Sequence, residues 1–167
     1  MSGEKPWIAG DLAITKSVLD AIYAHAKETY PSECCGFVSG PADDVARCDE
    51  AVREVNEADK YHRLDPVRFP RTSRTCFKIH EQRAARAFER GEASGRPIKV
   101  IYHSHCDAGS YFSAEDAATF ASEGALMWPC AFVVVSVMEG EPKGHQLWVH
   151  VPGTNEFREA PIRTIVE

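Results

Sequence analysis

The sequence predicts an α/β protein of the α+β type, in which a single mixed β-sheet is flanked by helices. In the first part of the chain, segments with helical spacing alternate with short apolar segments, and strand-like segments then follow one another. This order favours a mixed sheet with helices packed on it. We find no repeat, low-complexity tract or linker, so we expect residues 1–167 to form one domain.

The first helix is expected to begin after Thr15, which suits an N-cap, and to end before Pro31. The segment 34–40, CCGFVSG, is typical of a short buried strand, and a second strand is expected within 45–55. Apolar residues recur at helical spacing along the predicted helix: Val18, Ile22 and Ala26.

The middle of the chain contains a polar segment, 56–75, with two prolines and many charges. It is too long for a simple turn, and such segments are often functional loops or lids. The next segment, 76–91, predicts a helix that ends at Gly91. One side of this helix would be apolar, with Phe77, Ala84 and Phe88.

A β-branched, apolar segment at 97–105 predicts a strand. The helix predicted next spans 113–124, with Ser113 as its N-cap and Gly124 at its end. Three further strands are expected: a buried one at 130–138, an alternating one at 145–151 and an edge strand at 156–162.

The composition indicates a globular protein that binds neither nucleic acid nor membranes. Hydrophobic residues make up 44% and charged residues 26% of the chain, the net charge is −6, and no Lys/Arg-rich block occurs. The N-terminus lacks an apolar signal region, and the longest apolar run, AFVVV at 131–135, is too short for a membrane span. We therefore expect a cytoplasmic protein.

The six cysteines do not predict a disulfide framework, because there is no secretion signal and no spacing of a small stapled scaffold. No C-x-x-C occurs, which argues against thioredoxin-like and zinc-ribbon proteins. We expect reduced thiols, several of them buried.

The segment YHSHCDAGSYFSAED, residues 102–116, contains the candidate site. Side chains alternate along a strand, so His103 and His105 project to one face, together with Lys99 and Ile101. The first turn of the helix that follows can return the carboxylate of Asp116 to these imidazoles. Catalytic zinc usually has three such protein ligands and one open position, and no fourth ligand is evident nearby.

A simpler explanation of this segment is available from the same residues. Half-exposed strands often carry histidines, and Ser113 with Asp116 is the pattern of a capping box. An aspartate in the first turn of a helix is also favoured by the helix dipole. Spacing alone leaves both interpretations open.

The arrangement His-x-His, seven residues, Ser, two residues, Asp resembles the signature of the JAMM (MPN+) metalloproteases, with every position filled. The family also has an upstream glutamate, and Glu33 in PSECCGF occupies that place. The resemblance spans residues 12 to 138 and implies an MPN-like layered fold similar to that of cytidine deaminases. The chain departs from many members at Cys106, where they have proline, which changes the stiffness of the loop.

The resemblance implies that Zn²⁺ is the cofactor, that His103, His105 and Asp116 are its ligands, and that a zinc-bound water hydrolyses a peptide or isopeptide bond. Glu33 would act as general base and then as general acid. Ser113 would donate its hydroxyl to the oxyanion, and we expect its helix-capping bond to be imperfect, since one hydrogen cannot serve both roles. Without the resemblance, Glu33 would be a solvated charge.

The resemblance also implies a substrate. A compact member looks like the prokaryotic branch, whose partners are small ubiquitin-like or sulfur-carrier proteins with a diglycine tail that bears an extension or an amino-acid adduct. We expect the groove for this tail between the 56–75 segment and the strand with His103. The oligomeric state is left open, a homodimer included.

Three other functions fit the sequence less well. A metal-free MPN-like scaffold would only bind partners, and such domains usually lack one or more of the ligands. A zinc deaminase needs His-x-Glu and Pro-Cys-x-x-Cys, but PCAFV at 129–133 has no second cysteine. A zincin protease needs His-Glu-x-x-His, which is absent.

Overall fold

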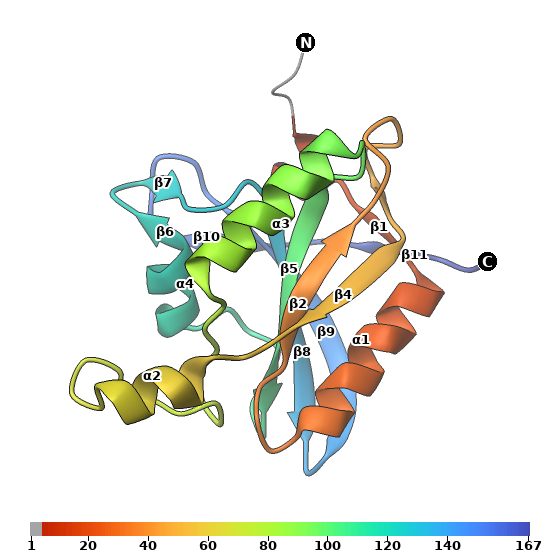
Figure 1. Ribbon diagram of the computed structural model, residues 1–167. Helices are drawn as coiled ribbons and strands as arrows, with labels where there is room; N and C mark the ends of the chain where they lie inside the picture. Colours follow the sequence, from red (N-terminus) through yellow and green to blue (C-terminus); the bar gives the residue numbers. More distant parts are fainter. Residues whose placement is uncertain (1–4) are drawn as a thin grey trace.

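The computed structural model describes residues 5–167, and a twisted six-stranded sheet forms its centre (Figure 1). The strand order is β10-β9-β8-β5-β2-β4, and only β5 and β8 run parallel to each other. The predicted mixed sheet with flanking helices is therefore confirmed. The strands are β2 (Cys35–Ser39), β4 (Glu50–Glu54), β5 (Ile98–Cys106), β8 (Ala131–Met138), β9 (Glu141–His150) and β10 (Phe157–Ala160).

Two small sheets accompany the central one and were not predicted. One joins three short strands in parallel, in the order β11-β1-β3, and the other is a two-stranded hairpin. Strands of two or three residues are too short to show a period-two pattern, which explains why the sequence does not reveal them. They are β1 (Ala13–Thr15), β3 (Arg47–Cys48), β6 (Ala121–Ser122), β7 (Ala125–Leu126) and β11 (Arg163–Ile165), and a 3₁₀ helix spans Pro6–Ala9.

The first helix, α1 (Lys16–Thr29), begins where the sequence predicts. The Thr15 hydroxyl accepts a hydrogen bond from the backbone N–H of Val18 at 3.3 Å, which satisfies one free donor of the first turn. The apolar stripe of α1 packs on one face of the central sheet, in a core cluster that includes Val38, Val100 and Val133. This face carries no candidate site residue.

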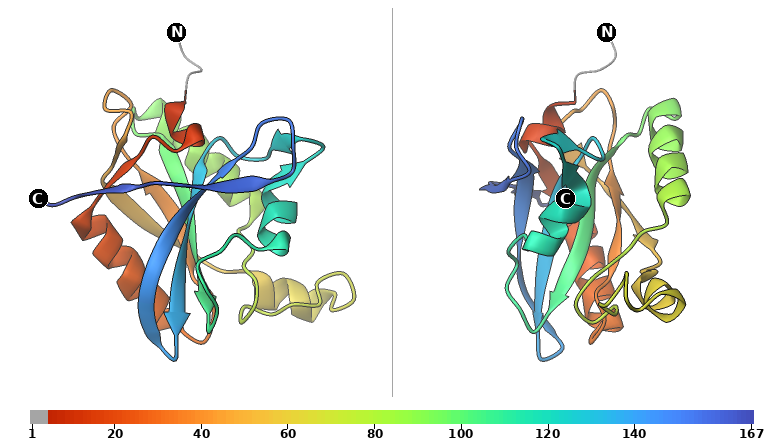
Figure 2. Two further views of the ribbon diagram at one scale, coloured as in Figure 1. Left: turned by 180° about the vertical axis from the view of Figure 1, so that it is seen from behind. Right: turned by 90° about the vertical axis from the view of Figure 1, so that its left-hand side faces the viewer.

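The opposite face of the sheet packs against α3 (Glu81–Ala93) and α4 (Ala114–Phe120). The right-hand view of Figure 2 shows α3 and α2 (Ala58–Leu64) on the same side of the sheet. The core on this side is aromatic, and Phe120, Phe132 and Phe37 are buried in it. The candidate metal ligands of β5 project to this second face.

The side chain of Lys99 does not share the face of Ile101, contrary to the sequence-based prediction. The pairing of β2 with β5 shifts register between Val38 and Ser39, which is a bulge that interrupts the alternation of side chains. The Lys99 ammonium lies over the ring of Trp7, in the core cluster of the α1 side, and donates to three backbone carbonyls at 2.8–2.9 Å.

The predicted helix over 76–91 is wrong at both ends. Residues 76–80 are not helical, and Phe77 instead packs into the core on the second face of the sheet. The helix continues past Gly91 to Ala93. A side chain at Gly91 would lie 2.8 Å from the carbonyl oxygen of Arg96, so the glycine permits close packing rather than ending the helix.

The helix predicted over 113–124 is also too long, since α4 ends at Phe120. The chain then forms the β6–β7 hairpin, whose turn residues Glu123 and Gly124 both have positive φ angles, of 53° and 79°. Two such residues in succession are typical of a type I′ hairpin turn. Gly124 therefore belongs to a hairpin and does not terminate a helix.

The polar 56–75 segment contains a helix, α2, which the sequence did not predict. Only Ala58 of α2 is buried, so the helix has no apolar stripe that would reveal it. Figure 1 shows α2 projecting from the body of the molecule, and Leu64 at its end and Val67 in the turn that follows are exposed. Polar side chains hold the segment, because Asp59 accepts hydrogen bonds from the backbone and hydroxyl of Ser73.

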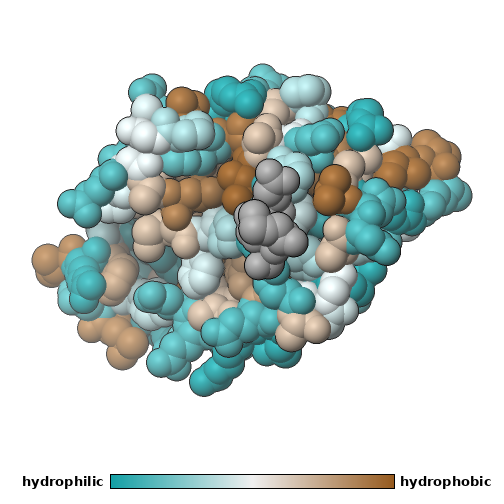
Figure 3. Space-filling view, turned by 90° about the horizontal axis from the view of Figure 1, so that it is seen from above, coloured by the Kyte–Doolittle hydropathy of each residue, from teal (hydrophilic) through white to brown (hydrophobic). Residues whose placement is uncertain are grey.

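The surface seen from above mixes hydrophilic and hydrophobic residues (Figure 3). Within residues 5–167, no helix is long and apolar enough to cross a membrane.

All six cysteines are free thiols, and every one except Cys106 is buried, in agreement with the prediction of reduced cysteines.

Candidate metal centre

The structure brings His103, His105 and Asp116 together at the end of β5. The Nε2 atoms of the two imidazoles lie 3.3 Å apart, and the Oδ2 atom of Asp116 lies 3.1 Å from that of His103 and 3.2 Å from that of His105. All three side chains are buried, with 0%, 5% and 5% of their surfaces exposed. Among residues 5–167 they form the one group of at least three acidic, histidine or cysteine side chains with this convergence.

The local structure of α4 holds the carboxylate in place. The backbone N–H of Ser113 donates to Asp116 Oδ2 at 3.0 Å, and the backbone N–H of Asp116 donates to the Ser113 hydroxyl oxygen at 3.0 Å. This reciprocal pair is the capping box that the sequence suggests. The cap and the convergence of three ligand atoms therefore occur together, and one does not exclude the other.

Ser113 caps the helix with its hydroxyl oxygen and not with its hydroxyl hydrogen. The Ser113 oxygen accepts the bond from Asp116, so the cap occupies a lone pair and leaves the hydroxyl hydrogen free. The expectation of an imperfect cap was wrong, because both halves of the capping box are formed. A complete cap is compatible with donation from the same hydroxyl to another group.

The proton positions imposed by the surroundings leave electron-rich atoms facing one another. His105 Nδ1 lies 2.8 Å from the carbonyl oxygen of Gly109, which can only accept, so this nitrogen carries the proton. Nε2 of the same ring lies 3.2 Å from Asp116 Oδ2, so a ring whose single proton is on Nδ1 directs a lone pair at the carboxylate. A cation between these atoms would remove the repulsion.

The separations of the three atoms fit a tetrahedral metal ion. Ligand atoms at about 2.0 Å from a tetrahedral zinc ion lie about 3.3 Å from one another. The observed separations of 3.1–3.3 Å agree with these edges. Two imidazoles and one carboxylate are also a donor set that suits a divalent metal ion with a position left open. His103, His105 and Asp116 could therefore hold such an ion.

Burial keeps His103 in the neutral form that a metal ligand requires. Its pKa is lowered, primarily by burial, against the opposing effect of Asp116. The ring stacks on Phe77 with centroids 4.3 Å apart, a contact hidden from sequence analysis because Phe77 was assigned to a helix. Within the described residues, His103 Nδ1 is buried without a hydrogen-bond partner.

Asp116 is held as a carboxylate. Burial raises its pKa, but the interaction with His103 and the hydrogen bond from the Ser113 backbone are among the effects that outweigh burial and bring the pKa well below its usual range. The site therefore combines an ionised carboxylate with a neutral imidazole at the pH of most cells.

Glu33 lies beside this centre because of the pairing of β2 with β5. Cys35 pairs with His103, and the backbone N–H of Ser104 donates to the Cys34 carbonyl at 3.2 Å, so the antiparallel register brings Glu33 opposite His105. Its backbone N–H donates to the carbonyl of Ser73 at 2.7 Å. The position of Glu33 beside His105 cannot be predicted from local sequence patterns, since one sequence does not specify which residues of two strands are paired.

The Glu33 side chain is buried, with 5% of its surface exposed. Burial, and next the negative charge of Asp116, raise the pKa of Glu33 to about 9, although Arg71 has the opposite effect. A carboxyl group with this pKa holds a proton at neutral pH in the absence of a neighbouring cation.

This titration predicts that the metal-free protein loses stability as the pH rises. The folded-state pKa of Glu33 is raised above its unfolded value, so the stabilising effect of its proton is full below about pH 4.5 and declines up to about pH 9. Between pH 5 and 7 the free energy of unfolding of the wild type should fall by about 2–3 kcal/mol relative to Glu33→Gln. Chemical denaturation of both proteins in chelator measures this difference, and parallel pH profiles would contradict it.

The loop that follows β5 orients His105 through its backbone. Gly109, whose carbonyl accepts from His105, lies between two anchored residues. Ser136 donates its hydroxyl to the Ala108 carbonyl at 2.6 Å, and Trp148 donates its indole N–H to the Ser110 carbonyl at 2.9 Å. Ser136 also pairs with His105 in the β5–β8 ladder. These two side chains therefore hold the acceptor that fixes the ring of His105.

If the three candidate ligands bind zinc, replacing Ser136 by alanine should weaken that binding, because outer hydrogen bonds that orient a ligand typically contribute ~10-fold or more to affinity. The substitution removes one hydroxyl and leaves the three candidate ligands unchanged. Competition with a chromophoric chelator measures the affinity, and Ser39→Ala on β2 serves as the control. Equal zinc affinities of the two variants would show that the loop anchor does not act on His105.

Comparison with known proteins agrees with this fold. The family of prokaryotic homologues of the JAB domain matches residues 15–151. The CysO-cysteine peptidase of Mycobacterium tuberculosis is 23% identical over 154 residues, covering 92% of this chain and 91% of that protein. A protein from Desulfitobacterium hafniense superimposes with a TM-score of 0.67 at 20% identity, over 93% of this chain and 94% of its own. A JAB1/MPN domain protein from Archaeoglobus fulgidus superimposes with a TM-score of 0.55 at 15% identity, over 93% and 99% of the two chains.

Proposed function

Because the chain belongs to the family of prokaryotic homologues of the JAB domain, we propose that it is a zinc-dependent peptidase. Its substrate is a ubiquitin-like or sulfur-carrier protein, and the bond cleaved follows the C-terminal diglycine tail of that protein. The convergence of His103, His105 and Asp116 beside a buried carboxyl group is the observation that carries this proposal. The name of the mycobacterial relative, CysO-cysteine peptidase, supports this class of substrate.

The three converging side chains hold the metal ion in this proposal. A zinc ion there would lower the pKa of an attached water from about 15.7 to about 7, polarise the scissile carbonyl and lower the pKa of the neighbouring Glu33 carboxyl. The carbonyl of Gly109 accepts from Nδ1 of His105, which would leave the other ring nitrogen of His105 available as a metal ligand.

Glu33 transfers a proton from the attacking water to the leaving amine in this proposal. Its carboxylate accepts a proton as water adds to the carbonyl carbon, and delivers it to the amine nitrogen as the C–N bond breaks. The products are a carrier that ends in a diglycine carboxylate and a free amine. The burial of Glu33 supports a transfer that is shielded from bulk water.

Ser113 stabilises the developing negative charge. Its hydroxyl hydrogen is not used by the helix cap, so it can donate to the oxyanion at the entrance of α4.

The tail of the carrier substrate has two glycines, and a narrow groove would reject larger residues by steric overlap. A cytoplasmic location remains a prediction from the sequence, which leaves the oligomeric state open, a homodimer included.

The test is incubation of the zinc-loaded protein with diglycine-tailed carriers, some with C-terminal extensions and some joined to lysine. Intact mass spectrometry should show release of the carrier after its second glycine, and a chelator should abolish the release. Carriers whose two terminal glycines are replaced by alanine should remain intact. A zinc-loaded protein that binds these carriers and cleaves none of them would favour a non-catalytic scaffold.

A further inference from the structure

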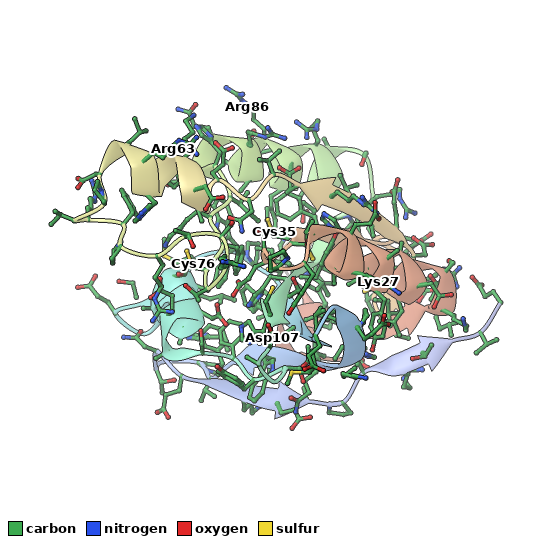
Figure 4. The ribbon with its side chains drawn as sticks, turned by 90° about the horizontal axis from the view of Figure 1, so that it is seen from below. Lys27, Cys35, Arg63, Cys76, Arg86 and Asp107 are labelled. Atoms are coloured by element: carbon green, nitrogen blue, oxygen red, sulfur yellow. The ribbon has the colours of Figure 1, made fainter. Side chains whose placement is uncertain are left out.

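A small cavity lies between the 56–75 segment and α4, on the side of the molecule that carries the candidate site. Its volume is about 50 Å³, and the residues that line it include Arg68, Arg71, Lys78 and Glu115. Cys76 also lines this cavity, and Figure 4 shows it between α2 and α4. We use the name cationic pocket for this cavity and its four charged residues.

The cationic pocket adjoins the metal-site residues through the chain itself. Glu115 directly precedes Asp116, and Cys76 directly precedes Phe77, which stacks on His103. Arg71 also influences Glu33, whose pKa it lowers. The lining of the pocket therefore includes direct chain neighbours of two residues at the candidate site, Asp116 and Phe77.

The charges of the pocket are not balanced by the protein. Three cationic side chains and one carboxylate line the cavity, and Arg71 Nε lies 3.4 Å from Glu115 Oε1. Within residues 5–167, neither Arg68 nor Lys78 takes part in a salt bridge. Such an excess of positive charge is notable in a chain with a net charge of −6. The ligand that matches this environment is an anion.

The cavity is small. Its volume of about 50 Å³ leaves room for a compact anionic group such as a carboxylate. Guanidinium groups bind carboxylates through charge-assisted hydrogen bonds, and two of the three cations are arginines.

We propose that the cationic pocket binds the free α-carboxylate of the amino acid that is released from the carrier tail. The inference rests on the proposed function and narrows it to substrates with one residue beyond the diglycine. A lysine joined through its side-chain amine within another protein has no free carboxylate at this position. The protein therefore prefers a carrier with a C-terminal amino-acid adduct to an isopeptide conjugate.

The experiment compares two forms of one substrate, a diglycine-tailed carrier extended by a single alanine that ends in either a carboxylate or a carboxamide. The wild type should cleave the carboxylate form with a kcat/KM about 10- to 100-fold higher, the range for a hydrogen bond to a charged group. The double variant Arg68→Gln, Lys78→Met should bring this ratio close to one. The ratio is taken within each protein, so differences in folding or zinc content cancel.

Arg63→Gln is the matched control, because Arg63 lies on α2 and does not line the cavity (Figure 4). It should retain the wild-type ratio. Equal cleavage of both forms by the wild type, or an unchanged ratio in the double variant, would overturn the inference while leaving the peptidase activity intact. If the wild type cleaves neither form, nor a lysine conjugate, the proposed function itself is wrong.

Discussion

Replacing Asp116 by asparagine is expected to abolish both zinc binding and hydrolysis. Asparagine has nearly the same shape and its carbonyl oxygen can still accept from the Ser113 backbone, so α4 should retain part of its cap. The amide lacks the negative charge that would hold a divalent ion beside the two imidazoles in the proposed site. We expect zinc affinity to fall at least ~100-fold, more than when an outer hydrogen bond is lost.

Zinc content after purification and turnover of the carrier are the two measurements for Asp116→Asn. The control is Ser113→Ala, which removes the other half of the capping box and leaves all three ligands. Ser113→Ala should retain zinc and lose turnover by about 10²–10³-fold through the missing oxyanion donor. If Asp116→Asn binds zinc as tightly as the wild type does, Asp116 is not a ligand.

Replacing Glu33 by glutamine is expected to separate metal binding from catalysis. Glutamine preserves the size of this buried side chain but cannot accept and return a proton. Zinc content should remain that of the wild type, and kcat should fall by about 10²–10⁴-fold, the range for loss of a general base. Metal analysis and intact-mass assays on the same preparation test both parts.

Glu28→Gln on α1 is the control for Glu33→Gln, because Glu28 is an exposed carboxylate that is paired with Arg53. It should leave both zinc content and turnover unchanged. Retained turnover in Glu33→Gln would mean that another group accepts the proton. Loss of zinc in that variant would instead assign Glu33 to the metal site.

The parts of the fold that the sequence predicts are those in which local pattern and tertiary structure agree. The apolar stripe of α1 and the long apolar strands β5 and β8 appear at their expected places. The predictions fail where a local signal has another cause. Gly91 permits close packing inside α3, and Gly124 forms a hairpin turn, although both residues are typical of helix ends.

The candidate site was predictable to the extent that its residues are close in sequence. His103, His105 and Asp116 lie on one strand and the following helical turn, so the spacing alone suggests their convergence. Glu33 lies at the site because of the register between β2 and β5, and Phe77 because its ring packs on His103. Neither contact follows from a local pattern in the sequence. The position of Glu33 was inferred only from the family resemblance.

The metal centre itself is tested most directly by the crystal structure of the zinc-loaded protein, with anomalous diffraction recorded on both sides of the zinc absorption edge. A single peak that appears above the edge, bonded to Nε2 of His103, Nε2 of His105 and a carboxylate oxygen of Asp116, is the predicted result. A protein that crystallises in the presence of zinc without a peak between these three atoms would contradict the account.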